Sequence, residues 1–103
     1  MWKSLGYITI TGTPVPISAT TQKCHAIFFQ QVRTNTGFIL CGRSGLNEGT
    51  GTDLNAVLPI PTNNSLPNAT VGIPDAMNAM EASQYFVDGT VNGDKCLVSI
   101  LIL

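Results

Sequence analysis

The sequence predicts an all-β fold: a small antiparallel, jelly-roll-like β-sandwich with six to eight short strands and at most one short helical turn. Three observations lead to this prediction. β-Branched residues are abundant, helical periodicity is nearly absent, and the apolar segments are short and separated by turns rich in Gly, Asn and Pro. The chain has 103 residues, the length of one domain, so residues 1–103 are expected to form a single sandwich.

The first strand is expected within Tyr7–Ser18, which reads YITITGTPVPIS. Ile8 and Ile10 alternate with polar or aromatic neighbours, which is the two-residue period of a half-buried strand. Pro14 and Pro16 have no N–H to donate to a strand ladder. The end of this segment should therefore lie at a sheet edge or leave the sheet.

The second strand is expected at Lys23–Arg33, which is apolar on both faces around Ala26–Phe29, as in the middle of a sandwich. Asn35 and Gly37, which tolerate positive φ, follow it, and the apolar segment Phe38–Gly42 comes next. We expect these two strands to form a hairpin.

The segment Arg43–Pro67 is rich in Gly and Pro and has little periodicity. It predicts a long irregular loop, with a short strand near Val57–Ile60, and a loop of this length in a small domain favours function or contact with a partner. Another strand is expected at Asn68–Ile73. Pro74–Ser83 is the only helix-compatible segment, because Asp75 could cap a run rich in Ala and Met.

The last two strands are expected at Gln84–Gly89 and Asp94–Leu103, with a second hairpin at Asn92-Gly93. The final strand is apolar on both faces, so it should be an inner strand of a sheet. Its side chains divide into Leu97, Leu101 and Leu103 on one face and Cys96, Val98, Ile100 and Ile102 on the other. One set can line the core. The other needs a cover, either the long loop or a neighbouring subunit, and we favour the neighbour.

Composition excludes several classes of partner. Charged residues make up 11% of the chain, against about 25% in an average soluble domain, so protein partners are expected. The five basic residues are scattered and the net charge is −1, which argues against nucleic-acid binding. The apolar run Cys96–Leu103 is far shorter than the roughly 20 residues of a membrane span, so no membrane contact is expected.

The three cysteines, Cys24, Cys41 and Cys96, are an odd number. This argues against a disulfide framework and favours free, buried thiols in a reducing compartment. His25 could meet Cys41 or Cys96 as a metal ligand, but the paired short spacings of zinc sites are absent. We expect no metal and no cofactor.

The acidic residues offer two weaker alternatives. Asp88 and Asp94 flank one turn, which fits calcium but fits a turn that uses Asp, Asn and Gly for local hydrogen bonds better. Glu48 and Asp53 share the long loop and could serve as an acid pair, although their spacing does not support it. No set of residues for nucleophilic catalysis is present, so an enzyme is not expected.

Four aromatic residues, Trp2, Tyr7, Tyr85 and Phe86, could form a platform that stacks on sugars. Aromatic residues of this kind more often belong to a core or an interface. We therefore expect packing roles for them and keep carbohydrate binding as an alternative.

Three segments, ITITGTPVPIS, FFQQVRTNTGFILCG and QYFVDGTVNGDKCLVSIL, together resemble the small all-β proteins of tailed bacteriophages. The positions that carry the resemblance are Asn35, Thr36, Gly37, Gly42, Tyr85, Val87, Gly89, Gly93, Asp94, Leu97 and Ser99. The chain departs from that pattern at Arg43–Pro67, which is longer and rich in proline, and in the more apolar strand that contains Cys96.

The resemblance implies a virion structural protein without catalytic activity: a capsid decoration or cement subunit that stabilises contacts between capsid proteins. The alternative is a neck, fibre, tail-associated or carbohydrate-binding module. The implied partners are the major capsid protein or other virion proteins and further copies of the chain, as a homo-oligomer, with a trimer favoured. The protein would be assembled in the host bacterial cytoplasm and reside on the capsid surface. The expected interface residues are Trp2, Tyr7, Pro59, Pro61, Leu97, Leu101 and Leu103.

Overall fold

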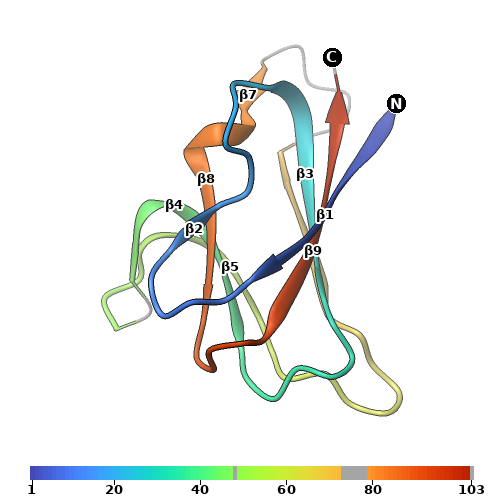
Figure 1. Cartoon of the computed structure of the whole chain (residues 1–103), viewed down its shortest axis with the longest axis vertical. Helices are drawn as coiled ribbons and strands as arrows, with labels where there is room; N and C mark the ends of the chain where they lie inside the picture. The colour runs from blue at the N-terminus through green and yellow to red at the C-terminus, as the bar shows by residue number, and fades with distance from the viewer. Residues whose placement is uncertain (48, 73–78, 103) are drawn as a thin grey trace.

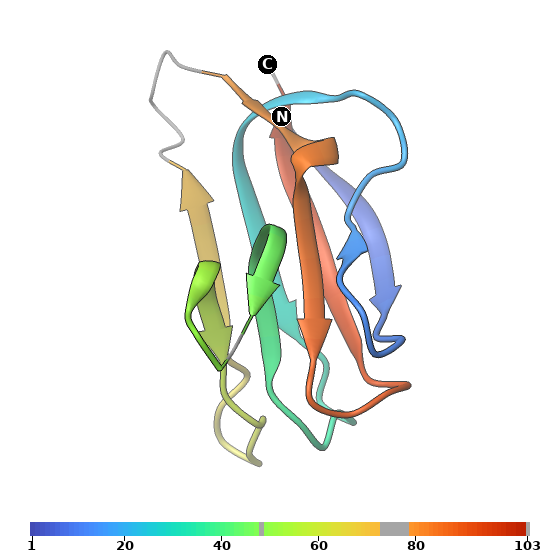
Figure 2. The ribbon, with the colours of Figure 1, turned by 90° about the vertical axis from the view of Figure 1, so that its left-hand side faces the viewer.

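The computed structural model describes residues 1–47, 49–72 and 79–102. In these residues nine strands form two antiparallel sheets, which pack face to face (Figures 1 and 2). In Figure 2 the second sheet lies in front of the first. The expected small β-sandwich is therefore confirmed. Within the described part of the chain, no helix is long and apolar enough to span a bilayer.

The first sheet has the strand order β1-β9-β3-β6, and β7 pairs with β3 off this path. Its strands are β1 (Trp2–Thr9), β3 (Lys23–Gln31), β6 (Asn68–Gly72), β7 (Met80–Glu81) and β9 (Lys95–Ile102). The last long strand, β9, lies between β1 and β3 and pairs with both. Its predicted position as an inner strand is confirmed.

The second sheet has the strand order β2-β8-β4-β5. Its strands are β2 (Val15–Pro16), β4 (Ile39–Asn47), β5 (Thr52–Leu58) and β8 (Tyr85–Gly89). The short β2 is an edge strand that contains Pro16, as the two prolines predicted. When the two-residue β7 is set aside, the two orders are those of a jelly roll of two four-stranded sheets, in which successive strands lie in different sheets except for β4 and β5.

The core lies between the sheets and is built from inward-facing apolar side chains. It consists of Ile10, Ile17, Cys24, Ile27, Phe29, Ile39, Cys41, Leu58, Ala82, Val87, Cys96, Val98 and Ile100. On β9, Cys96, Val98 and Ile100 have no exposed surface, whereas Leu97 and Leu101 are only half-buried. The strand therefore buries one of its two apolar faces in the core and turns the other outward.

Both predicted hairpins are wrong. The strands on either side of Asn35 and Gly37 are β3 and β4, which belong to different sheets, and the strands on either side of Asn92-Gly93 are β8 and β9, which also belong to different sheets. Each connection is an arch between layers. The turns were located correctly. However, a residue that favours a turn does not determine whether the two strands beside the turn pair with each other.

The prediction of one irregular loop over 43–67 is also wrong. Strand β4 continues to Asn47, and β5 returns beside it, so the true hairpin of this region is β4–β5. Its turn is closed by a hydrogen bond from Gly51 N to Asn47 O (2.8 Å) and by Asn47 Oδ1, which accepts from Gly49 N (2.8 Å). The expected short strand near Val57 therefore begins earlier, at Thr52.

The helix expected at Pro74–Ser83 falls partly outside the described residues, which resume at Ala79. Where the chain is described, Met80–Glu81 is the extended strand β7, and Ala82–Gln84 forms a 3-10 turn. Glu81 caps this turn, because its side chain accepts from Ser83 N. This turn is the only helical element in the described part of the chain, in line with the prediction of at most one.

Candidate interaction surface

The outward side of the first sheet carries the largest set of sequence-predicted interface residues. In antiparallel strands, residues directly opposite each other point to the same face, so the register defines three rows across β1, β9, β3 and β6. The rows are Trp2, Leu101, Ala26 and Gly72; Ser4, Ser99, Phe28 and Thr70; and Tyr7, Leu97, Gln30 and Asn68. We call these twelve residues the outer face.

The outer face is uncharged and has two exposed aromatic rings. None of its twelve residues, all of which the structure describes, is acidic or basic. Trp2 is 48% exposed and Tyr7 62% exposed, while Phe28, Leu97 and Leu101 are half-buried. Isolated exposed apolar residues are ordinary, but two exposed aromatic rings beside partly exposed Phe and Leu side chains, on three rows without charge, are typical of a surface that contacts another molecule.

A β-bulge in β1 brings the two aromatic rings to the same face. Trp2 and Tyr7 are five positions apart, so regular alternation would send them to opposite faces. The register between β1 and β9 shifts between Ser4 and Gly6, and the additional residue restores a shared face. Gly6 adopts φ +80 at the bulge, and its N–H donates to Ser4 Oγ at 3.1 Å.

One end of the outer face is hollowed. The hollow has a volume of about 240 Å³ and is lined by Tyr7, Gln30, Gln31, Val32, Arg33, Leu66 and Leu97. Arg33 Nη1 donates to the backbone oxygens of Thr62 (3.0 Å) and Asn63 (3.4 Å). These bonds hold the loop between β5 and β6 as the rim of the hollow beside Tyr7.

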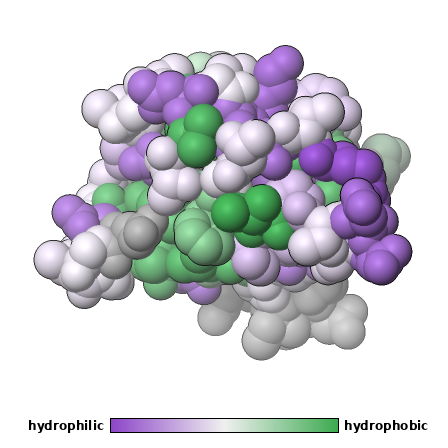
Figure 3. Space-filling view, turned by 90° about the horizontal axis from the view of Figure 1, so that it is seen from below, coloured by the Kyte–Doolittle hydropathy of each residue, from purple (hydrophilic) through white to green (hydrophobic). Residues whose placement is uncertain are grey.

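Two of the other predicted interface residues do not join this face. Pro59 and Pro61 lie in the loop after β5, and Leu103 lies outside the described residues. A separate group of partly exposed apolar side chains, Phe38 (39%), Ile60 (45%) and Val91 (37%), belongs to the arches and to that loop. Viewed from below, hydrophobic atoms form a band between hydrophilic ones (Figure 3).

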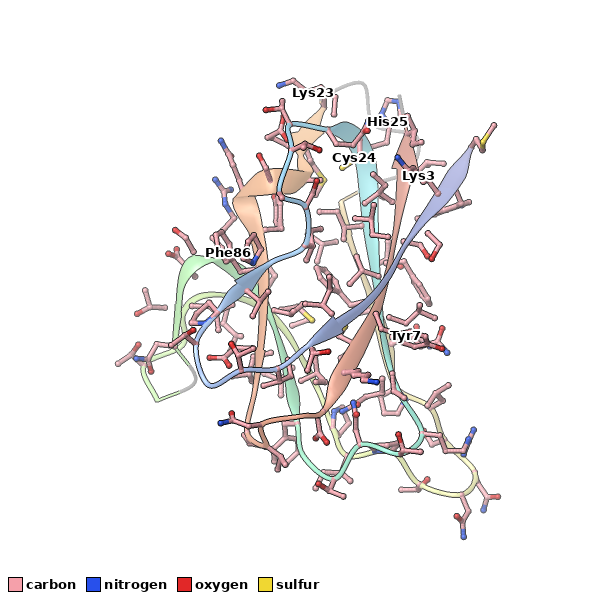
Figure 4. All side chains as sticks on the ribbon, viewed as in Figure 1. Lys3, Tyr7, Lys23, Cys24, His25 and Phe86 are labelled. Carbon is pink, nitrogen blue, oxygen red and sulfur yellow. The ribbon has the colours of Figure 1, made fainter. Side chains whose placement is uncertain are left out.

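The four aromatic residues do not form one platform. Trp2 and Tyr7 lie on β1 of the first sheet, whereas Tyr85 and Phe86 lie on β8 of the second, and Figure 4 shows Tyr7 and Phe86 on different sheets. The Arg43 guanidinium lies 5.1 Å from the centre of the Tyr85 ring, and Tyr85 also packs against the core. Only Trp2 and Tyr7 therefore share an exposed face.

The two carboxylates considered as calcium ligands instead accept hydrogen bonds from backbone N–H groups. Asp94 is buried, and its carboxylate accepts hydrogen bonds from Thr36 N (3.2 Å) and Gly37 N (2.8 Å). Asp88 Oδ1 accepts from Gly89 N at 2.8 Å. Within the described residues, no three His, Cys, Asp or Glu side chains lie close enough together to hold a metal ion.

Buried amides complete the same end of the sandwich. Gln31 Nε2 donates to the backbone oxygens of Gly37 (3.1 Å), Leu58 (3.2 Å) and Pro59 (3.0 Å). Asn35 Nδ2 donates to Gln31 Oε1 at 2.6 Å. These amides hold β3, the arch after it and the end of β5 in one arrangement, which fixes the rim of the outer face.

The remaining candidates are placed as follows. Cys24, Cys41 and Cys96 are all free and buried, which confirms the expected burial. Glu48 lies outside the described residues, so its pairing with Asp53 stays a prediction. His25, on β3, is half-buried.

Comparison of the chain with family models, with curated proteins and with solved structures found no match.

Proposed function

We propose that this chain is a structural protein of a bacteriophage virion without catalytic activity: a capsid decoration or cement subunit that binds the major capsid protein through the outer face. The observation that carries the proposal is the uncharged set of three rows, with Trp2 and Tyr7 exposed on it. A cement protein requires a rigid body with an apolar face and needs no active site.

The chemistry of the outer face suits stable docking. Trp and Tyr are among the residues that most often dominate the energy of protein interfaces. A stable contact buries about 1,600 Å² in total, and a sheet face spanning four strands offers a preorganised area for it. Repetition of such a contact over a capsid would add avidity to the affinity of each single contact.

Two further considerations support the proposal. Jelly rolls occur in viral capsid proteins and in lectins, although a fold alone does not set a function. The resemblance of three segments to small proteins of tailed phages points in the same direction. A symmetric homo-oligomer, with a trimer favoured, belongs to the proposal, because capsids present symmetric binding sites.

A carbohydrate-binding module is the second candidate, and the hollow beside Tyr7 is the observation that favours it. An exposed Tyr ring with the Gln30 amide and the Arg33 guanidinium on one hollow provides a stacking surface and hydrogen-bond donors for a sugar. A glycan array tests this candidate, and specific binding that the Tyr7→Ser variant loses would favour it over the cement function.

The test of the cement function uses particles of the phage that encodes the chain. Quantitative mass spectrometry of purified particles should find the protein in many copies, and the purified protein should cosediment with capsids that lack it. The double variant Trp2→Ser, Tyr7→Ser should lose at least about tenfold in affinity. A protein that is absent from particles and monomeric by light scattering, and that ignores capsids, would overturn the proposal.

A matched double variant controls for general loss of apolar surface. Val57 and Ile60 are each 45% exposed, close to the exposure of Trp2, but neither belongs to the outer face. The variant Val57→Ser, Ile60→Ser should bind capsids like the wild type. If this variant loses binding and the outer-face variant keeps it, docking occurs through the second sheet and the loop that contains Pro59 and Pro61.

A further inference from the structure

Strand β6 is an edge strand of the first sheet, and its register shows which of its backbone groups face away from that sheet. Gln31 N donates to Pro67 O at 2.9 Å, so these two residues form a hydrogen-bonded pair just before β6. In an antiparallel ladder, such pairs alternate with pairs that exchange no hydrogen bonds. The N–H and C=O groups of Ala69 therefore point toward β3, whereas those of Asn68 and Thr70 point away from it.

The outward side of β6 has no strand beside it in the described part of the chain. The first sheet ends at β6, and in Figure 2 this strand, the gold arrow, lies at one margin of the molecule. Asn68 and Thr70 are both exposed, and their outward backbone groups make no hydrogen bond to another described residue. A row of unpaired N–H and C=O groups on a sheet edge is a template for one further strand.

The other three edges of the sandwich carry features that oppose strand addition. Strand β1 has the bulge at Gly6, and its Lys3 lies on the same face as the core residue Ile100. Strand β2 is two residues long and contains Pro16. Strand β5 contains the exposed Asp53, which has a positive φ of 52°. Bulges, prolines and charges protect sheet edges, and β6 has none of them, because NATVG is uncharged and pairs with β3 in regular register.

We propose that the outward side of β6 pairs with β6 of a second copy of the chain, antiparallel and about a twofold axis at Ala69. Asn68 of each copy then lies opposite Thr70 of the other, and each of these two pairs exchanges two N–H···O bonds. Ala69 meets its counterpart in the pair between them, where strands approach most closely and a small side chain fits. A twofold axis would bring any charge on β6 close to its own copy, and like charges across a ladder are destabilising, so an uncharged strand suits a second copy.

Pairing through β6 would also enlarge the outer face. Four strands about 4.8 Å apart and three rows about 6.6 Å apart cover on the order of 400 Å², whereas a standard interface takes about 800 Å² from each partner. Two copies joined at β6 would present two outer faces on one continuous sheet. The need for this area rests on the proposed cement function, but the geometry of the β6 edge does not. The contact is twofold and leaves any threefold contact of the expected trimer to other surfaces.

Light scattering and amide hydrogen exchange of the isolated wild-type chain test the pairing without capsids. We expect an even number of copies, and an N–H of Thr70 that exchanges at least about tenfold more slowly in the paired than in the dissociated chain. The N–H of Ala69 bonds to β3 and should be protected in both states, which makes it an internal control. A chain that is a monomer or a trimer, or rapid exchange at Thr70 in the oligomer, would overturn the proposal.

A proline variant removes one outward donor and leaves the ladder with β3 intact. Thr70→Pro should halve the mass of the oligomer, because an edge strand tolerates a proline whose missing N–H faced outward, but a second copy then loses its donor. Thr9→Pro is the matched control on the exposed edge strand β1. Ile10 N donates to Asp94 O at 2.8 Å, so the N–H of the adjacent Thr9 points away from β9, and this variant should keep the wild-type mass.

The outcomes separate this contact from the cement function. Equal masses for the wild type and a folded Thr70→Pro chain would overturn the β6 contact, and the exchange of the wild type decides where that variant does not fold. A chain that pairs through β6 but ignores capsids would support the contact and overturn the cement function. A monomer that binds capsids would do the reverse.

Discussion

The carboxylate of Asp94 accepts a hydrogen bond from the backbone N–H of Gly37 at 2.8 Å, although the two residues are 57 positions apart in the chain. The same carboxylate accepts from Thr36 N. Asp94 ends the arch from β8 to β9, and Gly37 lies in the arch from β3 to β4. One buried side chain therefore connects the two arches at one end of the sandwich by hydrogen bonds.

Replacement of Asp94 should loosen this end. Asp94→Ala leaves two backbone N–H groups without their acceptor, and an unsatisfied buried donor costs about 1–3 kcal/mol. We expect the free energy of unfolding, measured by urea denaturation, to fall by about 2–3 kcal/mol. Asp94→Asn keeps one acceptor oxygen and should lose less. Asp88→Ala is the control, because among the described residues the Asp88 carboxylate accepts a hydrogen bond only from its neighbour Gly89. An equal loss in both alanine variants would contradict this role.

Gln31→Glu should be among the most damaging substitutions in the chain. Gln31 is 1% exposed, and its Nε2 donates to three backbone oxygens. A carboxylate there removes the donor and places a buried negative charge against those oxygens, which costs about 3–5 kcal/mol. Gln30→Glu is the matched control, since Gln30 faces outward and is half-buried. Comparable urea midpoints for the two variants would show that Gln31 does not hold the arch.

The two arches show where prediction from the sequence ends. Asn35 and Asn92-Gly93 correctly marked the turns, because turn chemistry depends on a few adjacent residues. Whether such a turn closes a hairpin or crosses between sheets depends on contacts distant in the chain. Asn35 Oδ1, for example, accepts from Lys95 N at 2.9 Å, 60 positions away. Local patterns carry no information on such pairs.

The outer face was predictable in part. The two apolar faces of β9 followed from strict alternation, and the structure has β9 as an inner strand. That Trp2 and Tyr7 share a face did not follow, because the bulge at Gly6 reverses the alternation. A glycine inside an otherwise regular strand was the available indication. Similarly, Leu54, Ala56 and Leu58 alternate along β5, but the surrounding glycines and prolines obscured this period.

Gly42→Ala should destabilise the β4–β5 hairpin that the sequence did not predict. A Cβ at Gly42 would collide with the backbone oxygen of Asp53 on the facing strand, and the strands cannot separate without loss of ladder hydrogen bonds. Overpacking of this kind costs about 1–3 kcal/mol, which thermal unfolding would detect. Gly49→Ala is the control, since its Cβ would approach only the Asn47 side chain, at 3.3 Å. A melting temperature that falls equally in both variants would contradict the close approach.

Lowering the pH should weaken the hydrogen bonds through which the Glu81 carboxylate holds β7 in place. Glu81 Oε2 accepts from Gln22 N (2.7 Å), Ser83 N (3.2 Å) and Ser83 Oγ (3.0 Å). The hydrogen bond from Gln22, followed by those from Ser83 and by nearby Lys23, lowers the pKa of Glu81 below its ordinary value of 4.5, against a smaller opposing effect of desolvation. The ionised form is thus favoured in the folded state. Its contribution to stability is fully present above pH 4.5 and is lost as the pH falls through the lowered pKa.

Glu81→Gln isolates this contribution, because the amide keeps an acceptor oxygen but has no charge to lose. At neutral pH the wild type should unfold at a higher urea concentration than the variant. The gap should shrink steadily as the pH is lowered below 4.5, because protonated Glu81 resembles glutamine as an acceptor. Asp53→Asn, at an exposed position on β5, provides the comparison for an acid without these bonds. A gap that stays constant or widens on acidification would show that the Gln22 and Ser83 hydrogen bonds do not depend on the charge of Glu81.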